Sequence, residues 1–336
     1  MKRVTIKDVA EYLTISVSTV SRALSGDKNI RNETREQVLD AAKRLGYKPN
    51  PVATNLKFGR TNTVGVIVPE MITPYASQVI VGIQEVLHRE GIKVIISDSS
   101  ESWELERENI ATFEGFMVDG VIASICDYKQ NSEEYMRLQR NGMPVVFYDR
   151  IPHKMNVSQV IVDDYIKSFF LTEELIRSGR KNIVHIHGSD RIYNSFERAR
   201  GYKDALKKFH IPVREELIVR SGVEFNEGAE AVEHLLNNGI QFDAIFAFTD
   251  TLAIGALNRL RAAGIDVPSD VAVASFSGTI LATVVTPPLS SVEPPLKQMG
   301  REAANLILEK IRNPDSPTRS IVLDAEIKLR ASTGAE

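Results

Sequence analysis

The sequence predicts an α/β protein: an N-terminal all-α head of the helix-turn-helix type, followed by a body of two doubly wound parallel-sheet subdomains. Residues 1–60 contain three short amphipathic segments with helical spacing, whereas apolar runs and amphipathic helices alternate through the rest of the chain. Residues 1–60 also carry 12 Lys and Arg against 6 Asp and Glu, while the remaining 276 residues carry 29 against 38. A basic head on an acidic body is typical of a nucleic-acid-binding module joined to a larger domain.

The composition excludes several classes of protein. Of the 336 residues, 43% are hydrophobic and 25% are charged, which is ordinary for globular domains and excludes a disordered or collagen-like chain. No apolar run reaches the roughly 18 residues of a membrane-spanning helix, and the charged N-terminus leads into no apolar signal-peptide core. The single cysteine, Cys126, can form neither an internal disulfide nor a zinc cluster. We therefore expect a cytoplasmic protein.

The first two helices of the head are predicted from their caps and apolar faces. Thr5 and Asp8 have the spacing of a capping box at the start of the first helix. The apolar face of this helix contains Val9, Tyr12 and Leu13. After the tight connection Thr14-Ile15, Ser16 is placed to cap a second helix. The inner face of the second helix contains Val20, Ala23 and Leu24.

The outer face of the second helix is small and polar, and it ends in an arginine. It contains Val17, Ser18, Ser21 and Arg22. Short side chains let such a helix approach the major groove of DNA, where donors reach base edges or phosphates. A third helix, capped by Asn32 or its neighbour and ended by Gly46, closes a helix-turn-helix head. The same pattern also fits a small three-helix bundle that contacts another protein.

The segments Val4–Ala10, Val17–Leu24, Thr34-Arg35 and Leu45–Asn50 form a nearly continuous pattern. This pattern closely resembles the head of the LacI/GalR family of bacterial transcription regulators. The resemblance implies that three residues of the second helix, Val17, Ser18 and Arg22, read bases. It also implies phosphate or groove-edge contacts by Thr5, Thr19, Ser21 and Asn29.

The head departs from the family pattern in two places. Thr14-Ile15 replaces the usual pair of small residues in the turn, which could tilt the recognition helix. Arg31 stands where the family often has a serine that caps a helix and touches phosphate. We expect Arg31 to meet a phosphate by charge, while the cap comes from Asn32.

Residues 49–61 are predicted to form a hinge. Pro51 suits the first turn of a short helix, but so short a helix is marginal alone in water, and a flexible linker is the alternative. The resemblance implies a hinge helix that orders on operator DNA beside that of its dimer mate, with Leu56 wedged between base steps in the minor groove. Thr54-Asn55 departs from the Ala-Arg common in the family.

The body, residues 62–336, alternates buried strands with helices. Apolar runs predict the strands Val64–Val68, Val94–Ser97, Gly120–Ala123, Val145–Tyr148, Ile183–Ile186, Ala244–Phe248 and Val271–Ser275. So many units indicate two subdomains, about 62–161 plus 293–330, and 162–292. This arrangement resembles the periplasmic-binding-protein-like body that the family shares. Ligands bind such sheets at the carboxyl ends of strands, here in a cleft between the subdomains.

Polar residues at strand ends are the candidates for effector binding. Asp149, Asp163, Arg198 and Asp250 could take several sugar hydroxyls, although Asp163 and Asp250 could instead cap helices. Arg198 and Asp250 fall on family motif positions. Tyr75, with Ser77, follows the turn in which Thr73 replaces the family's Asn, and its ring could stack on a ligand.

Ser277 replaces the aspartate that commonly accepts sugar hydroxyls in the family. Because serine carries no charge, an acidic or phosphorylated effector is less disfavoured than usual, with Arg198 and Ser277 as its partners.

The resemblance implies a transcription regulator: a dimeric repressor of carbohydrate-metabolism genes. Its partners would be pseudo-palindromic double-stranded operator DNA, a homodimer mate and a small-molecule effector, a sugar or sugar derivative, in the cleft. A protein co-regulator on the body surface remains an alternative to the cleft ligand. No heptad repeat follows Leu329, so we expect no coiled-coil tetramer.

Rival classes find little support in the sequence. A transport receptor needs a signal peptide and no basic head. An enzyme needs a catalytic constellation, but no G-x-S-x-G, G-x-G-x-x-G or Walker motif occurs. His185 and His187 lie in a predicted strand with no acidic partner nearby in the sequence. We therefore expect no enzyme activity, no metal and no cofactor.

Overall fold

The computed structural model describes residues 4–47, 60–153 and 155–335. The chain forms two compact units, Met1–Thr61 and Asn62–Glu336, and each is described here by itself. No helix among the described residues is long and apolar enough to cross a membrane.

The first unit contains the three predicted helices of the head: α1 (Ile6–Leu13), α2 (Val17–Leu24) and α3 (Asn32–Leu45). The capping box of α1 is present, since Thr5 N donates to Asp8 Oδ2 at 2.6 Å. Ser16 caps α2, because its hydroxyl accepts from Thr19 N at 3.1 Å. The shared core contains Val9, Ala10, Val20, Ala23, Val38 and Ala41.

Two details of the head differ from expectation. Tyr12 is 56% exposed, because these short helices bury only a narrow stripe and Tyr12 lies at its edge. Arg31 occupies the N-cap position of α3 without a side-chain cap bond, and Asn32 is the first helical residue, so Asn32 does not supply the cap. Gly46 ends α3 with a φ of 70°, as expected.

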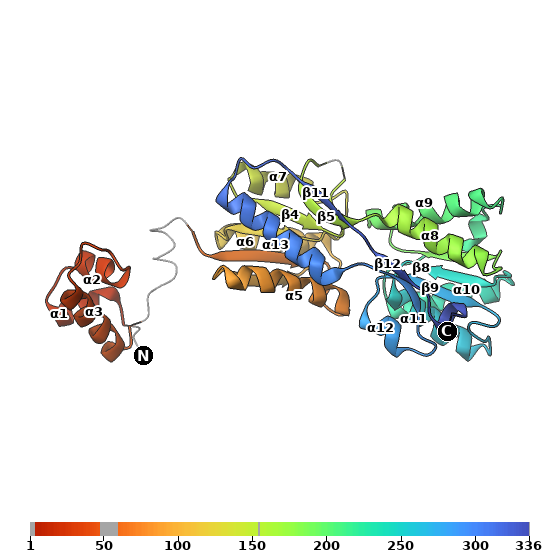
Figure 1. The fold of residues 1–336 in the computed structure, drawn as a ribbon, viewed down its shortest axis with the longest axis horizontal. Helices are drawn as coiled ribbons and strands as arrows, with labels where there is room; N and C mark the ends of the chain where they lie inside the picture. The colour runs from red at the N-terminus through yellow and green to blue at the C-terminus, as the bar shows by residue number, and fades with distance from the viewer. Residues whose placement is uncertain (1–3, 48–59, 154, 336) are drawn as a thin grey trace. The chain divides into compact units, whose positions relative to one another are not determined.

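The second unit contains two six-stranded sheets, which confirms the predicted fold class (Figure 1). The first sheet has the order β11-β5-β4-β3-β1-β2 and is parallel throughout. Its strands are β1 (Thr63–Val68), β2 (Lys93–Asp98), β3 (Gly120–Ala123), β4 (Val145–Tyr148), β5 (Ser158–Val162) and β11 (Ser320–Leu323). The helices of this half are α5 (Pro74–Arg89), α6 (Trp103–Gly115), α7 (Ser132–Arg140) and α13 (Leu296–Arg312).

The second sheet has the order β12-β10-β9-β8-β6-β7 and is parallel except for the β10–β12 pair. Its strands are β6 (Ile183–His187), β7 (Ile218–Arg220), β8 (Ala244–Ala247), β9 (Ala272–Phe276), β10 (Ser290–Glu293) and β12 (Glu326–Lys328). The helices of this half are α8 (Asp164–Arg177), α9 (Tyr193–Lys208), α10 (Phe225–Asn237), α11 (Asp250–Ala262) and α12 (Ile280–Val284). Short 3-10 turns lie at Glu215–Leu217 and Ala331–Thr333.

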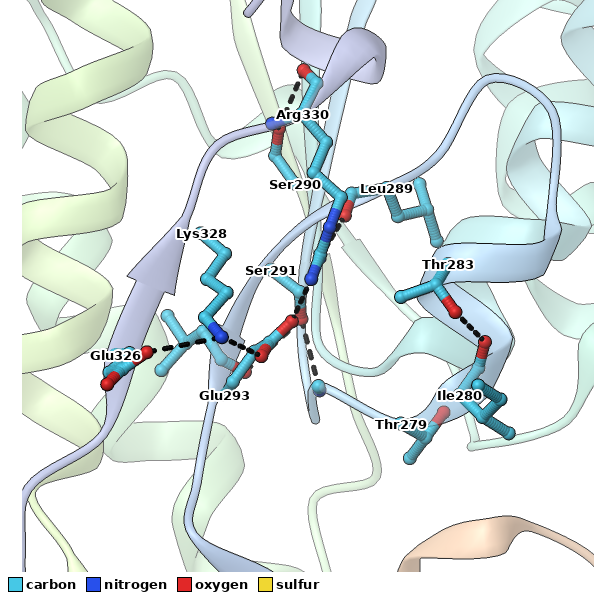
Figure 2. Close-up of polar contacts among 12 residues, drawn as sticks. Thr279, Ile280, Thr283, Leu289, Ser290, Ser291, Glu293, Glu326, Lys328 and Arg330 are labelled. Atoms are coloured by element: carbon cyan, nitrogen blue, oxygen red, sulfur yellow. Dashed lines mark hydrogen bonds and ion pairs between the residues drawn. The ribbon is translucent and has the colours of Figure 1, made fainter. Parts of the chain in front are cut away.

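The C-terminal segment passes between the halves once more than expected. We expected residues 293–330 to stay with the first half, and α13 and β11 do so. However, β12 pairs with β10 in the second sheet, with Ser291 opposite Lys328. Figure 2 shows the reason: Glu293 on β10 holds both Lys328 and Arg330 of the returning segment by ion pairs. Because β12 has only three residues, of which two are charged, it has no apolar pattern from which the sequence could predict it.

Helices α5 and α13 pack backbone to backbone in the first half. A Cβ atom on Gly82 of α5 would collide with the carbonyl oxygen of Lys297, and one on Gly300 of α13 would collide with that of Val79. Both positions therefore require glycine for the helices to approach this closely. The contact anchors the C-terminal helix against the first half of the body.

Candidate functional site

Helix α2 presents the residues expected to read bases on one exposed face. Val17 is 41% exposed and Ser18 and Arg22 are also exposed, whereas Val20 and Ala23 on the opposite side are buried in the head core. The helical period separates the two sets. The outer face thus combines a small apolar group, a hydroxyl and a guanidinium, which suits contact with base edges.

Several residues expected to contact phosphates or the groove edge are held by local hydrogen bonds. Thr5 caps α1, and the hydroxyl oxygen of Thr19 lies 2.8 Å from that of Ser16. Asn29 Nδ2 donates to Asp27 Oδ1 at 3.0 Å. These bonds fix the orientation of the three side chains.

The remaining head candidates are placed as follows. Ser21 is half-buried on α2, and Arg31 is exposed at the start of α3. Leu56 and the rest of 48–59 lie outside the described residues.

An open cavity lies between the two halves of the body. It opens where β1, β3, β4, β8 and β9 end, as expected for parallel sheets. It brings together five of the seven candidate effector residues: Tyr75, Asp149, Arg198, Asp250 and Ser277. Ser77 is not among its lining residues, because its exposed hydroxyl donates to Pro74 O at 2.9 Å within the first turn of α5.

Asp163 and its neighbour Asp164 have different roles. Asp163 Oδ1 accepts from Ile166 N at 2.9 Å, so Asp163 caps α8, as the sequence allowed as an alternative to effector binding. Asp164 is buried and bonds to Arg198 instead. The sequence shows only two adjacent aspartates, and the direction of α8 decides which one turns inward.

The buried Asp164 belongs to a polar bridge between the two halves of the body. Asn194 on α9 donates to Asp164 Oδ2 at 3.0 Å in its own half and, at 3.5 Å, to Asp149 Oδ1 across the cleft. Tyr75 OH donates to the same Asp149 oxygen at 3.0 Å. Burial raises the pKa of Tyr75 well above 10, so this hydroxyl remains a donor.

Arg198 occupies the base of the cavity. Its Nε donates to Asp164 Oδ1 at 2.7 Å and its Nη1 to Phe248 O at 2.6 Å. The guanidinium lies 3.7 Å from the ring centre of Phe276 and 4.4 Å from that of Phe248. Burial raises the pKa of Asp164 to about 6, although the Arg198 charge opposes this shift.

Asp250 is 1% exposed and organises the loop that follows β9. Its carboxylate accepts from Ser275 Oγ at 2.7 Å, Ser291 Oγ at 3.1 Å, and Thr279 N and Oγ1 at 2.8 and 2.9 Å. The cap of α11 is Thr249 instead, so the capping role considered for Asp250 is wrong. Asp250 lines the cavity with its acceptor positions already engaged.

The surroundings of Ser277 and Arg198 give little support to the expectation that these two residues bind an acidic or phosphorylated effector. Ser277 Oγ bonds to the carbonyl oxygen of Phe276, its own neighbour, and Arg198 already pairs with a buried carboxylate. An anionic group would have to compete with Asp164 for the guanidinium.

The sequence reasoning did not single out several lining residues. These are Glu70, Glu101, Ser124, Arg150, Asn194 and Glu224. Three of them follow strand ends, at β1, β3 and β4, so the rule that located Asp149 could have found them.

Among the described residues, no group of three or more His, Cys, Asp or Glu is placed to hold a metal. His185 is fully buried, with Nδ1 3.0 Å from Phe246 O. Burial lowers its pKa to about 3. This histidine is a neutral core residue stacked on Tyr202.

Comparisons with known proteins match both units. Residues 5–50 match the family "Bacterial regulatory proteins, lacI family", and residues 172–333 match "Periplasmic binding protein-like domain". Catabolite control protein A of Priestia megaterium is 34% identical, over 98% of this chain and 99% of that protein. The transcriptional repressor CytR of Escherichia coli strain K12 is 31% identical, over 98% and 96%. The chain belongs to the LacI family of bacterial regulatory proteins.

Solved structures agree with this family membership. A complex of the transcriptional regulator CelR with cellobiose matches with a TM-score of 0.75 and 29% identity, over 98% of this chain and 100% of that one. The lac repressor dimer bound to operator and the anti-inducer ONPF matches with a TM-score of 0.85 over 99% and 100%; at 22% identity it shows the fold alone.

This LacI-family chain is a DNA-binding transcription regulator and not an enzyme. The interpretation of α2 as part of a DNA-binding head is therefore confirmed over a bundle for protein contact. The readings as a transport receptor or as a metabolic enzyme are set aside, because the matched relatives are regulators and repressors.

Proposed function

We propose that this LacI-family regulator acts in the cytoplasm as a homodimeric repressor of carbohydrate-metabolism genes. Its two heads bind a pseudo-palindromic operator, and a sugar or sugar derivative in the body cavity controls that binding. The cellobiose complex of its relative CelR supports a sugar-sized ligand.

In the head, we assign base reading to the exposed face of α2, with Arg22 as the strongest donor. Thr5, Thr19, Ser21, Asn29 and Arg31 hold phosphates or the groove edge. Leu56 wedges into the minor groove and bends the duplex.

The observation that carries ligand control is the polar bridge. Asn194 contacts Asp149 in one half and Asp164 in the other, so a ligand bonded to Asp149 changes how the halves are held. Coupling of about 1–3 kcal/mol between such sites corresponds to roughly 5- to 150-fold control of operator affinity.

Selection of bound sites from random duplex DNA tests the DNA-binding part. The full-length protein at fixed ionic strength should enrich a motif with two-fold symmetry. Failure to enrich any motif would contradict the proposal.

Operator affinity is then measured with and without a panel of sugars. At least one sugar should change the affinity by 5-fold or more. The alternative is control by a protein co-regulator. In that case no small molecule changes the operator affinity, but addition of cell lysate changes it.

A further inference from the structure

Three buried polar atoms on the first wall of the cavity have no hydrogen-bond partner among the described residues. They are Ser124 Oγ, Tyr148 OH and Glu101 Oε1. Ser124 and Tyr148 are each only 1% exposed, and all three residues line the cavity. A buried polar group without a partner is costly, so such groups mark places where a ligand or water binds.

The sheet places two of these atoms on neighbouring strands, and the third belongs to a loop at the same edge. Ala123 of β3 lies opposite Phe147 of β4, so Ser124 and Tyr148 are the next pair along neighbouring strands. Glu101 follows β2 and is tied to the end of β1, since its N donates to Pro69 O at 2.7 Å. Its carboxylate reaches the end of β4, where Oε2 accepts from Arg150 Nη1 at 2.8 Å.

The charges around these atoms are mainly negative. Three carboxylates, Glu70, Glu101 and Asp149, line this wall beside a single guanidinium, Arg150, which Glu101 already pairs. Glu70 and Asp149 both act electrostatically on Tyr148, and Glu101 remains half-buried, so water screens these charges poorly.

We propose that this wall binds a protonated amine of the effector at Glu101 Oε1, while Ser124 Oγ and Tyr148 OH bond to hydroxyls of the same ligand. The effector class is therefore a polyhydroxylated amine such as an amino sugar. This inference rests on the proposed function, because it specifies the ligand of the same cavity.

An ammonium group fits better than the two other common substituents of sugars. It carries a positive charge and three donors but no acceptor, which matches the orphan carboxylate oxygen of Glu101 in a negative field. The hydroxyls of Ser124 and Tyr148 both donate and accept, so they pair with hydroxyls of the sugar instead. A hydroxyl beside Glu101 supplies one donor and no charge to balance the carboxylates. A phosphate would meet three carboxylates and a guanidinium that is already paired.

The test is isothermal titration of the full-length protein with matched sugars. The probes are glucosamine, galactosamine and mannosamine, each with its neutral parent hexose, its N-acetyl form and the corresponding hexose 6-phosphate. At least one free amine should bind 10-fold or more tightly than its parent, and acetylation should abolish that advantage. The proposal is overturned if no amine exceeds its parent, or if a 6-phosphate binds most tightly.

Variants then locate the amine. Glu101→Gln should weaken amine binding roughly 10- to 100-fold and leave binding of the neutral parent within about twofold. Ser124→Ala, which keeps the Arg150 pair, should weaken binding of the amine and of its parent alike, because its hydroxyl contacts a hydroxyl that both ligands share. Glu133→Gln, an exposed carboxylate that pairs with Arg140 on α7 and does not line the cavity, is the matched control and should have little effect. Equal losses for amine and parent in Glu101→Gln would refute the assignment.

The two proposals fail separately. A neutral sugar that releases the operator would overturn the amine site and leave the regulatory function intact. Tight amine binding without any effect on operator affinity would retain the site and overturn ligand control.

Discussion

Removing the Arg198 side chain should make the stability of the body depend on pH through Asp164. In Arg198→Met the apolar bulk remains between Phe248 and Phe276, but Asp164 loses its only described ion-pair partner. Removing one member of a buried pair typically costs about 3–5 kcal/mol of unfolding free energy, because a buried charge is left alone.

The sign follows from the pKa of Asp164. Burial already raises this pKa from 3.8 to about 6 in the folded protein, so the ionised carboxylate costs about 3 kcal/mol above pH 6. Without Arg198 the folded pKa rises further. Between the unfolded and folded pKa values the folded state binds more protons, so unfolding free energy falls as pH rises through this window. The variant should therefore recover much of its loss at pH 5.

Urea unfolding of the full-length protein at pH 5, 6, 7 and 8, followed by circular dichroism of the body transition, measures this effect. Arg198→Met with Asp164→Asn should recover part of the loss at pH 8, since no buried charge remains. Arg177→Met is the matched control: this guanidinium pairs with Glu173 but is 58% exposed, and its loss should cost less than about 1 kcal/mol. The reasoning is refuted if the unfolding free energy of Arg198→Met depends on pH as that of the wild type does. It is also refuted if the double variant is no more stable at pH 8 than Arg198→Met alone.

Three further predictions address the head, the hinge and the helix packing. Arg22→Ala should cost about 1–3 kcal/mol of operator-binding free energy and relax the preference at one base pair, measured by titration of single-substituted operators. The control Arg31→Ala, at the phosphate candidate that precedes α3, should weaken binding to all sequences equally. A loss from Arg22→Ala that is equal across all sequences would assign Arg22 to phosphate contact instead. Leu56→Ala should reduce operator affinity and the bending of operator DNA, measured by gel mobility of circularly permuted fragments, and should leave the Tm of the body unchanged. Unaltered DNA bending would show that Leu56 is not a minor-groove wedge. Gly300→Ala should lower the unfolding free energy of the body by about 1–3 kcal/mol, because its Cβ meets the backbone of α5, and a neutral result in urea unfolding would show that the helices can separate.

The helices of the head could be predicted from the sequence because local interactions define where they begin. The capping box of Thr5 and Asp8 and the cap at Ser16 involve residues three apart, so their spacing alone predicts the bonds later observed. The strands Gly120–Ala123 and Val145–Tyr148 were likewise predicted to the residue, because parallel strands buried on both faces are short, continuous apolar runs.

The interior of the cavity depends on contacts between distant residues. Whether Asp163 or Asp164 turns inward, and whether Asp250 is open to a ligand or engaged by Ser275 and Thr279, is decided by side chains that meet only after folding. The orphan hydroxyls of Ser124 and Tyr148 are also invisible in the chain, because a missing partner is a property of the packed surroundings. Sequence pattern therefore predicts the elements and the edge at which a ligand binds, whereas three-dimensional packing decides which polar atoms at that edge remain to bind it.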